Sequence, residues 1–283
     1  MQHSPPALSQ PEPGLSKRAA LLAALLGAVG AQVFGAAASL VVLLALAVLN
    51  GASKLEELQA LAERPIVLLL AGPAVSLSLL GVACCAPLLL RVSLKRALGL
   101  SPPPVWSFPL AVCAIPGVAV VGDLLAQGLS TLLPHFTLGT GLALMEASRS
   151  QSLPLLILVL ALLPGVAEEL FFRGMLQRAF GNTFGAALVV AAVFAVYHLD
   201  PPHVAATLPI GLYMGWLGVR FKSTVLPAAV HVANNSLAIA AARSDTLAFG
   251  FGSEVGVPWW WAGPSLSVAV VVLALVARAT KEG

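Results

Sequence analysis

The chain is organised as long apolar runs separated by short polar segments. An α-helix rising about 1.5 Å per residue needs about 20 apolar residues to cross about 30 Å of hydrocarbon. Eight runs predict membrane-spanning helices, at about 19–49, 66–90, 105–133, 152–172, 183–199, 204–220, 224–242 and 259–278. Trp259, Trp260 and Trp261 open the last run, as expected of an aromatic anchor at the membrane interface. The pattern predicts an all-α, polytopic transmembrane helix bundle of about eight spans.

Composition strengthens this prediction. Of the 283 residues, 59% are hydrophobic and only 10% are charged, and the mean hydropathy is +0.94. A soluble domain carries roughly a quarter charged residues, and a disordered chain is far less apolar. The net charge of +3 is not gathered on a basic face, which argues against a nucleic-acid partner. We therefore expect a multi-pass integral membrane protein, in the plasma (inner) membrane if the source is bacterial.

Basic residues outside the spans predict the orientation of the bundle. With a cytoplasmic N-terminus, ten basic residues fall on the inner side and four on the outer side. The inner set is Lys17, Arg18, Arg91, Lys95, Arg96, Arg178, Arg220, Lys222, Arg278 and Lys281, and the outer set is Lys54, Arg64, Arg149 and Arg243. This excess agrees with the positive-inside rule, so both termini are expected in the cytoplasm. The pattern indicates no particular oligomeric state.

Ionisable residues are costly inside a membrane, so each one is a functional hypothesis. The first cluster contains Glu168, Glu169 and Arg173, after a strongly apolar stretch. Glu169 and Arg173 are four residues apart and can pair on one helix face. Adjacent helical residues lie about 100° apart, which leaves Glu168 on the neighbouring face for another task. Alternatively, the cluster is a group of interfacial charges at the end of the fourth span.

Two more polar clusters follow. His198 closes the apolar run that begins near Phe184, and His231 shares a face of the seventh span with Asn235. Taken alone, the first is typical of an interfacial histidine and the second of a hydrogen-bonding pair between helices. Taken together with Glu168, they suit the attack of water on a carbonyl. A carboxylate and an imidazole can hold and deprotonate water, and a second imidazole and an amide can stabilise an oxyanion.

The three clusters resemble the three motifs of the CPBP intramembrane proteases, in the family's order and spacing. These proteases include the CAAX-processing endopeptidases and the bacteriocin-processing and self-immunity (Abi) proteins. The motifs here are Glu168-Glu169-x-x-x-Arg173, Phe194-x-x-x-His198 and His231-x-x-x-Asn235, and the resemblance covers about residues 150–242. It divides the chain into four parts: a disordered polar tail at 1–16, about three N-terminal spans at 17–149, the catalytic core at 150–242, and a loop with the final span at 243–283.

The resemblance implies an intramembrane endopeptidase that cleaves a membrane-embedded or lipidated peptide or protein. It implies that Glu168 is the general base and that His198 shares the activation of water. His231 and Asn235 would stabilise the oxyanion, and Glu169 and Arg173 would support the site. Two other functions stay open: a non-enzymatic membrane immunity or scaffold protein, and a proton-coupled transporter that uses Glu168 and the histidines as a relay.

The cofactor prediction favours no metal. Glu168, His198 and His231 are a possible zinc ligand set, since catalytic zinc sites use such residues. However, the histidines are 33 residues apart and form no His-Glu-x-x-His pair, and the same residues can act by acid–base catalysis.

One expectation conflicts with this site. His198 would lie near the outer end of the fifth span, whereas His231 would lie only about 10 Å from the inner end of the seventh. The two histidines can meet only if helices are tilted, kinked or unequal in length. Pro164 and Gly165, just before the first motif, offer a kink.

Overall fold

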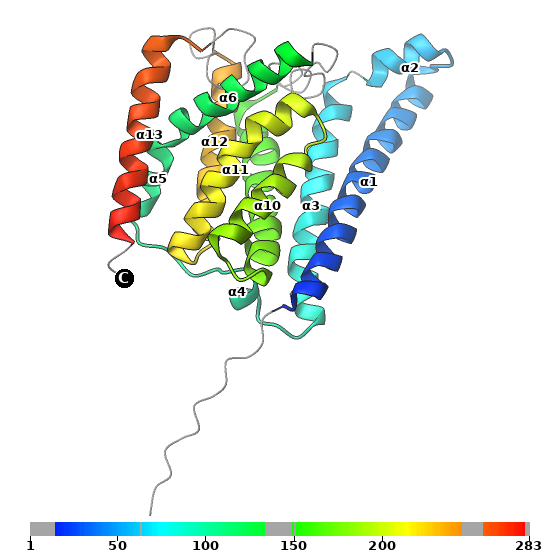
Figure 1. Cartoon of the computed structure of the whole chain (residues 1–283). Helices are drawn as coiled ribbons and strands as arrows, with labels where there is room; N and C mark the ends of the chain where they lie inside the picture. The colour runs from blue at the N-terminus through cyan, green and yellow to red at the C-terminus, as the bar shows by residue number, and fades with distance from the viewer. Residues whose placement is uncertain (1–14, 63, 134–148, 150, 245–256, 281–283) are drawn as a thin grey trace, which may run out of the picture.

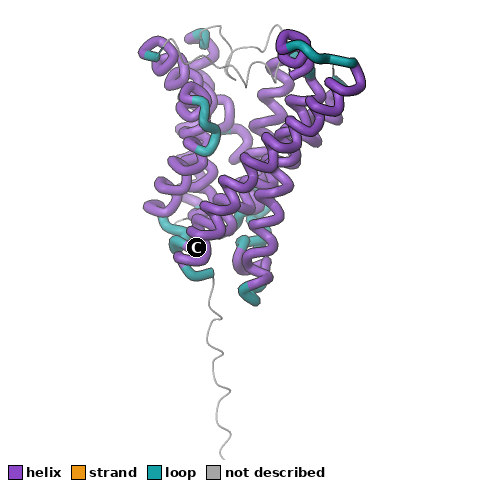
Figure 2. Tube along the Cα trace, turned by 90° about the vertical axis from the view of Figure 1, so that its right-hand side faces the viewer, coloured by secondary structure: helices purple, strands orange, loops and turns teal. Residues whose placement is uncertain are grey.

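The computed structural model describes residues 15–62, 64–133, 149, 151–244 and 257–280. Across these residues the secondary structure consists of helices joined by loops, with no strand (Figure 2). Of the tail predicted at 1–16, only Leu15 and Ser16 lie within the described residues. The all-α prediction is confirmed, while the division into four parts stays a prediction.

The helices follow one another in a simple up-and-down order (Figure 1). In chain order they are α1 (Lys17–Asn50), α2 (Leu55–Ala62), α3 (Pro65–Leu89), α4 (Leu94–Ala97), α5 (Ser107–Cys113), α6 (Ile115–Leu132), α8 (Leu153–Leu156), η1 (Ile157–Leu162), α9 (Leu163–Glu169), η2 (Leu170–Gln177), α10 (Phe184–Val196), α11 (Pro201–Phe221), α12 (Val225–Ala242) and α13 (Trp259–Ala279). The η segments are π-helical and, with α8 and α9, form one continuous rod.

Seven described helices are long and apolar enough to cross a membrane. Their bounds are Lys17–Asn50, Leu69–Leu89, Ser107–Leu132, Leu153–Gln177, Pro201–Phe221, Val225–Ala242 and Trp259–Ala279. The eighth apolar run, expected at 183–199, forms α10, a helix of only 13 residues. At the standard rise α10 is about 20 Å long, which is short of the bilayer's hydrocarbon thickness.

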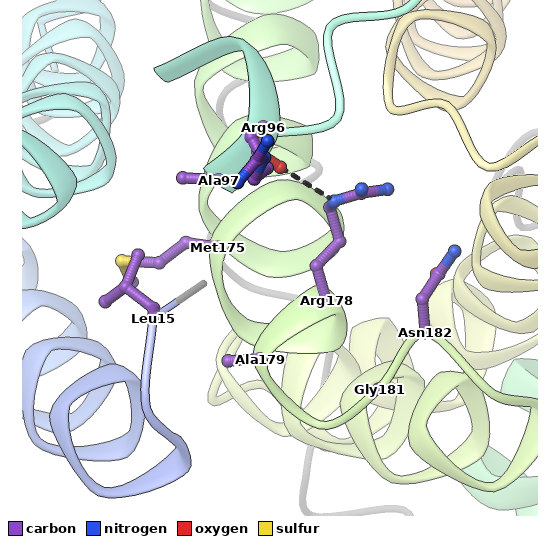
Figure 3. Close-up of a pocket in the computed structure, with 8 residues that line it drawn as sticks. All are labelled: Leu15, Arg96, Ala97, Met175, Arg178, Ala179, Gly181 and Asn182. Carbon is purple, nitrogen blue, oxygen red and sulfur yellow. Dashed lines mark hydrogen bonds between the residues drawn. The ribbon is translucent and has the colours of Figure 1, made fainter. Parts of the chain in front are cut away.

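The two ends of the bundle agree with the predicted topology. The helix α1 begins and α13 ends at the same end, the lower one in Figure 1. Arg178 lies at this end, where its Nε donates a hydrogen bond to the Arg96 carbonyl (3.3 Å) and its Nη1 to the Lys222 carbonyl (3.3 Å). Figure 3 shows the bond to Arg96. These two bonds connect Arg178 with Arg96 and Lys222, and all three residues belong to the set predicted on the inner side. The cytoplasmic orientation of this end stays a prediction.

Glycines let the central helices approach closely. Along α11, Gly211, Gly215 and Gly218 face η2, and a Cβ at Gly215 would come within 3.2 Å of the Gln177 side chain. The Gly211 and Gly215 carbonyls accept hydrogen bonds from Arg173 and Gln177 of η2. The carbonyls of α11 thus accept hydrogen bonds from both buried polar side chains of η2, although Arg173 Nε and Gln177 Oε1 have no partner among the described residues.

The rod that carries the first motif is widened around Pro164. Proline has no N–H to donate to the carbonyl four residues earlier, and its ring clashes with that carbonyl. The residue four positions before Pro164 is Leu160, within η1. Pro164 accounts for a departure from regular α-helix here, and π-helical turns are often found at functional sites.

Candidate active site

Glu169 and Arg173 form the predicted pair in the interior of the bundle. Arg173 Nη1 donates to Glu169 Oε1 at 2.7 Å, and the exposed fractions of the two side chains are 1% and 0%. Arg173 Nη2 donates to the Gly211 carbonyl at 2.9 Å, and the guanidinium carbon lies 4.4 Å from the centroid of the Phe194 ring. A buried charge requires such partners because it has lost its hydration. Arg173 thus fixes Glu169 to α10 and α11.

Glu169 also contacts the third motif. The same oxygen, Oε1, lies 2.9 Å from Nδ1 of His231. Because a carboxylate only accepts, Nδ1 of His231 carries a hydrogen and donates it. The opposite ring nitrogen, Nε2, then faces Glu168, whose Oε2 lies 3.9 Å away. This gap is too long for a hydrogen bond. The sequence placed Glu169 beside Arg173, and the structure shows that it also orients His231.

Glu168 occupies the more accessible side of this cluster. Its side chain is 12% exposed, whereas that of Glu169 is fully buried. The two neighbouring carboxylates therefore differ as predicted. Glu169 is held by two charged or polar partners, and Glu168 faces His231 without a direct hydrogen bond among the described residues.

His198 reaches this cluster because α10 is short. The His198 and His231 rings pack edge-on against the same Phe194 ring, with centroid distances of 5.0 and 5.8 Å. The expectation that the fifth span continues to 199 is wrong, since α10 ends at Val196. Because α10 ends at Val196, His198 lies in the turn after it and packs on the same Phe194 ring as His231.

The tautomer of His198 follows from its hydrogen bond. Its Nδ1 lies 2.9 Å from the Phe194 carbonyl, which can only accept, so Nδ1 carries the hydrogen. In the neutral ring Nε2 is then an acceptor. An imidazole nitrogen of this kind can hold a water molecule and remove its proton.

Asn235 shares a helix face with His231 but has a structural partner. Its side-chain amide donates to the Leu160 carbonyl at 3.2 Å, and its Oδ1 accepts from Asn234. Leu160 is the residue whose carbonyl loses its α-helical donor to Pro164. Asn235 therefore joins α12 to the widened part of the first-motif rod, which leaves one amide hydrogen for any further role.

Sequence reasoning missed two residues beside His198. His203 lies at the start of α11, with its ring centroid 4.5 Å from that of His198. Tyr197 precedes His198 and packs edge-on against Phe172, at a centroid distance of 5.5 Å. A signal for His203 was present, because Pro201 and Pro202 force a turn directly after His198. The sixth span was expected to begin at 204, which placed His203 in a connecting loop.

Within the described part of the chain, no group of three or more His, Cys, Asp and Glu side chains is placed to hold a metal ion. A cavity of about 230 Å³ lies at the C-terminal end of η2, lined by Arg96, Arg178, Asn182 and small or apolar residues (Figure 3). It contains none of the predicted site residues.

The family comparison covers the helices that build this cluster. Residues 150–237 match the family model described as type II CAAX prenyl endopeptidase Rce1-like. The matched segment is therefore similar to the CAAX proteases. This similarity agrees with the resemblance drawn from the three motifs and indicates a hydrolase of peptide bonds. Neither the curated proteins nor the solved structures include a match to the chain.

The match and the helices together support a coarse description of the protein. It is a multi-pass integral membrane protein, and its segment 150–237 is similar to an intramembrane endopeptidase family that implies a membrane-associated peptide substrate. This favours a protease over the transporter and the non-enzymatic scaffold.

Proposed function

We propose that the chain hydrolyses a peptide bond of a lipidated or membrane-embedded substrate with Glu168 as the general base. One observation carries the assignment: His231 is fixed by Glu169 with its free Nε2 facing Glu168 across 3.9 Å. A water molecule or a substrate oxygen fits between two such groups, whereas a direct hydrogen bond would close the space. The Glu169–Arg173 pair holds this geometry in the interior of the bundle.

In the proposed reaction, Glu168 accepts a proton from water, with Nε2 of His198 as the second acceptor that positions it. The water oxygen bonds to the carbonyl carbon, and the carbonyl π electrons move to the oxygen, which becomes the oxyanion. His231 takes part with both ring nitrogens protonated: Nδ1–H stays on Glu169 and Nε2–H donates to that oxygen, as does the remaining amide hydrogen of Asn235. When the intermediate collapses, the carbon–nitrogen bond breaks and Glu168 returns the proton to the leaving amine.

We propose acid–base catalysis without a metal. The Nδ1 atoms of His198 and His231 are each used as donors to an oxygen of the protein, so only one nitrogen of each ring remains available. If zinc is used instead, the ligand set is Glu168, His198 and His231. Dialysis against a chelator distinguishes the two, since the acid–base mechanism predicts full activity afterwards. Loss of activity that added zinc restores would favour the zinc set.

The substrate class follows from where the site lies. The three motif helices are membrane-spanning or membrane-embedded, and exposed leucines and valines cover the outward faces of neighbouring helices. A substrate with an apolar anchor can therefore reach the site from the bilayer. We propose a peptide that carries a lipid near the scissile bond, of which a farnesylated peptide ending in a CAAX sequence is the simplest probe.

The test is cleavage of that peptide by purified protein in liposomes. We expect Glu168→Gln to lower kcat by at least about 100-fold, because a positioned general base contributes roughly 10²–10⁴ in rate. Glu56→Gln, which changes an exposed carboxylate on α2, serves as the matched control and should leave cleavage unchanged. Equal cleavage by wild type and Glu168→Gln would refute the assignment. If this peptide is not cleaved, comparison of peptide termini in membranes from wild-type and Glu168→Gln cells identifies the substrate.

A further inference from the structure

Tyr197 lies beside His198 and has no role in the mechanism above. It is the first residue after α10. Its ring packs against Phe172, a residue that follows Glu168 by one helical turn. The centroid of the Tyr197 ring lies 6.3 Å from that of His198, the second proposed acceptor of the water proton. From the other side, the Gln32 side chain of α1 donates to the Tyr197 carbonyl at 3.2 Å. The backbone and ring of Tyr197 are therefore both held in place.

The hydroxyl of Tyr197 differs from the rest of the residue. It is buried and has no hydrogen-bond partner among the residues that the structure describes. Leaving a buried hydroxyl unpaired is unfavourable, and such groups call for a functional explanation. The chain has one other tyrosine, Tyr213, and its hydroxyl donates to the Ala111 carbonyl at 2.9 Å. One tyrosine is thus satisfied by the fold and the other is not.

A further donor would strengthen the oxyanion site. Of the two donors proposed there, Asn235 has already given one amide hydrogen to the Leu160 carbonyl and has one left for the substrate. A phenol titrates near pH 10 in its ordinary state, so it carries its hydrogen at neutral pH and can donate. Donors already placed where negative charge develops stabilise the transition state without reorganising.

We propose that the Tyr197 hydroxyl donates a hydrogen bond to the scissile carbonyl oxygen as this becomes the oxyanion, which makes Tyr197 a catalytic residue. The proton stays on the phenol oxygen, and no covalent bond to Tyr197 forms or breaks. This inference rests on the proposed peptidase function, and it assigns the missing partner of the hydroxyl to the substrate.

The two tyrosines provide a matched experiment with the same farnesylated peptide in liposomes. We expect Tyr197→Phe to lower kcat by about 100-fold, the usual effect of losing an oxyanion donor, and to change KM by less than about twofold. Its Tm should equal or exceed that of wild type, because an unpaired hydroxyl is removed. Tyr213→Phe should show the reverse, with a lower Tm and a kcat within about threefold of wild type.

A binding measurement separates transition-state contacts from structural ones. A farnesylated peptide phosphonate, which mimics the tetrahedral intermediate, should bind Tyr197→Phe about 100-fold more weakly than wild type. The uncleaved substrate peptide should bind the Glu168→Gln single variant and the Glu168→Gln, Tyr197→Phe double variant with equal affinity.

The outcomes separate this inference from the proposed function. If wild type cleaves the peptide and Tyr197→Phe has the same kcat, the hydroxyl has no catalytic role and the inference is overturned while the function stands. A lower Tm with unchanged phosphonate affinity would likewise show a structural tyrosine. If wild type cleaves neither this peptide nor any membrane peptide, both proposals fall together.

Discussion

At Gly165, the helices that carry the first and third motifs approach each other too closely to leave space for a methyl group. A Cβ at Gly165 would lie 2.8 Å from Val232 Cγ2 and 2.9 Å from the Val232 backbone nitrogen, where ordinary contacts begin at 3.4 Å. Gly165→Ala therefore pushes α9 and α12 apart by about half an ångström at this point. Val232 follows His231, so the displacement acts directly on the 3.9 Å gap between His231 and Glu168.

The expected effect on the rate is larger than the effect on stability. A misplacement of 1 Å costs about 100-fold in rate, so half of that costs about 10-fold in kcat. Overpacking costs about 1–3 kcal/mol, and replacing glycine by alanine within a helix returns about 1 kcal/mol. The net loss of stability is therefore about 0–2 kcal/mol, which leaves a folded protein for kinetic measurement.

Gly30→Ala is the matched control, because a Cβ at Gly30 in α1 meets nothing within 4 Å. Both variants would be compared for kcat on the farnesylated peptide and for Tm in the same detergent. Adding Val232→Ala to Gly165→Ala should restore part of the rate, since it removes the Cγ2 clash and leaves the backbone clash. If Gly165→Ala is as active and as stable as Gly30→Ala, the close approach does not set the geometry of the site.

Three further changes test the supports of the site. Arg173→Met leaves Glu169 buried without its cationic partner, and we expect a loss of about 3–5 kcal/mol in unfolding measurements, whereas an unchanged Tm would show that the ion pair is dispensable. Asn235→Ala leaves the Leu160 carbonyl without this donor, which should lower the free energy of unfolding by about 1–3 kcal/mol and also lower activity. Loss of activity at an unchanged Tm would mean that Asn235 acts on the substrate alone. Arg178→Gln removes two hydrogen bonds to backbone carbonyls at the bundle end, and Tm should fall slightly while kcat stays within about twofold.

Much of the architecture follows from hydropathy alone, because helices in a bilayer must satisfy their backbone groups internally. The first and last spans were expected at 19–49 and 259–278, and they form α1 and α13 with nearly those bounds. The pair of Glu169 and Arg173 was also predictable, since a four-residue spacing is enough to bring them together on a helix.

The depth of the second motif could not be predicted in this way. The apolar run around α10 continues through Val196, so its hydropathy does not show where the helix ends. The end depends on a turn in which Leu199 adopts a left-handed backbone conformation, with a φ of 63°, and Pro201 begins a new helix. Partners across the bundle, such as Leu160 for Asn235 or Gln32 for Tyr197, were likewise invisible, because they depend on how separate helices pack.

The hydrogen bond from Gln32 to the Tyr197 carbonyl bears on how the chain can be divided. Gln32 lies in the first helix, far outside the matched segment 150–237, yet it supports the turn that presents His198. Gly27 of the same helix packs against Phe171, so α1 covers the rod that carries the first motif. The motif-bearing segment is therefore not a portable module. Grafted without α1, it would keep every motif residue and lose the wall against which the second motif is held.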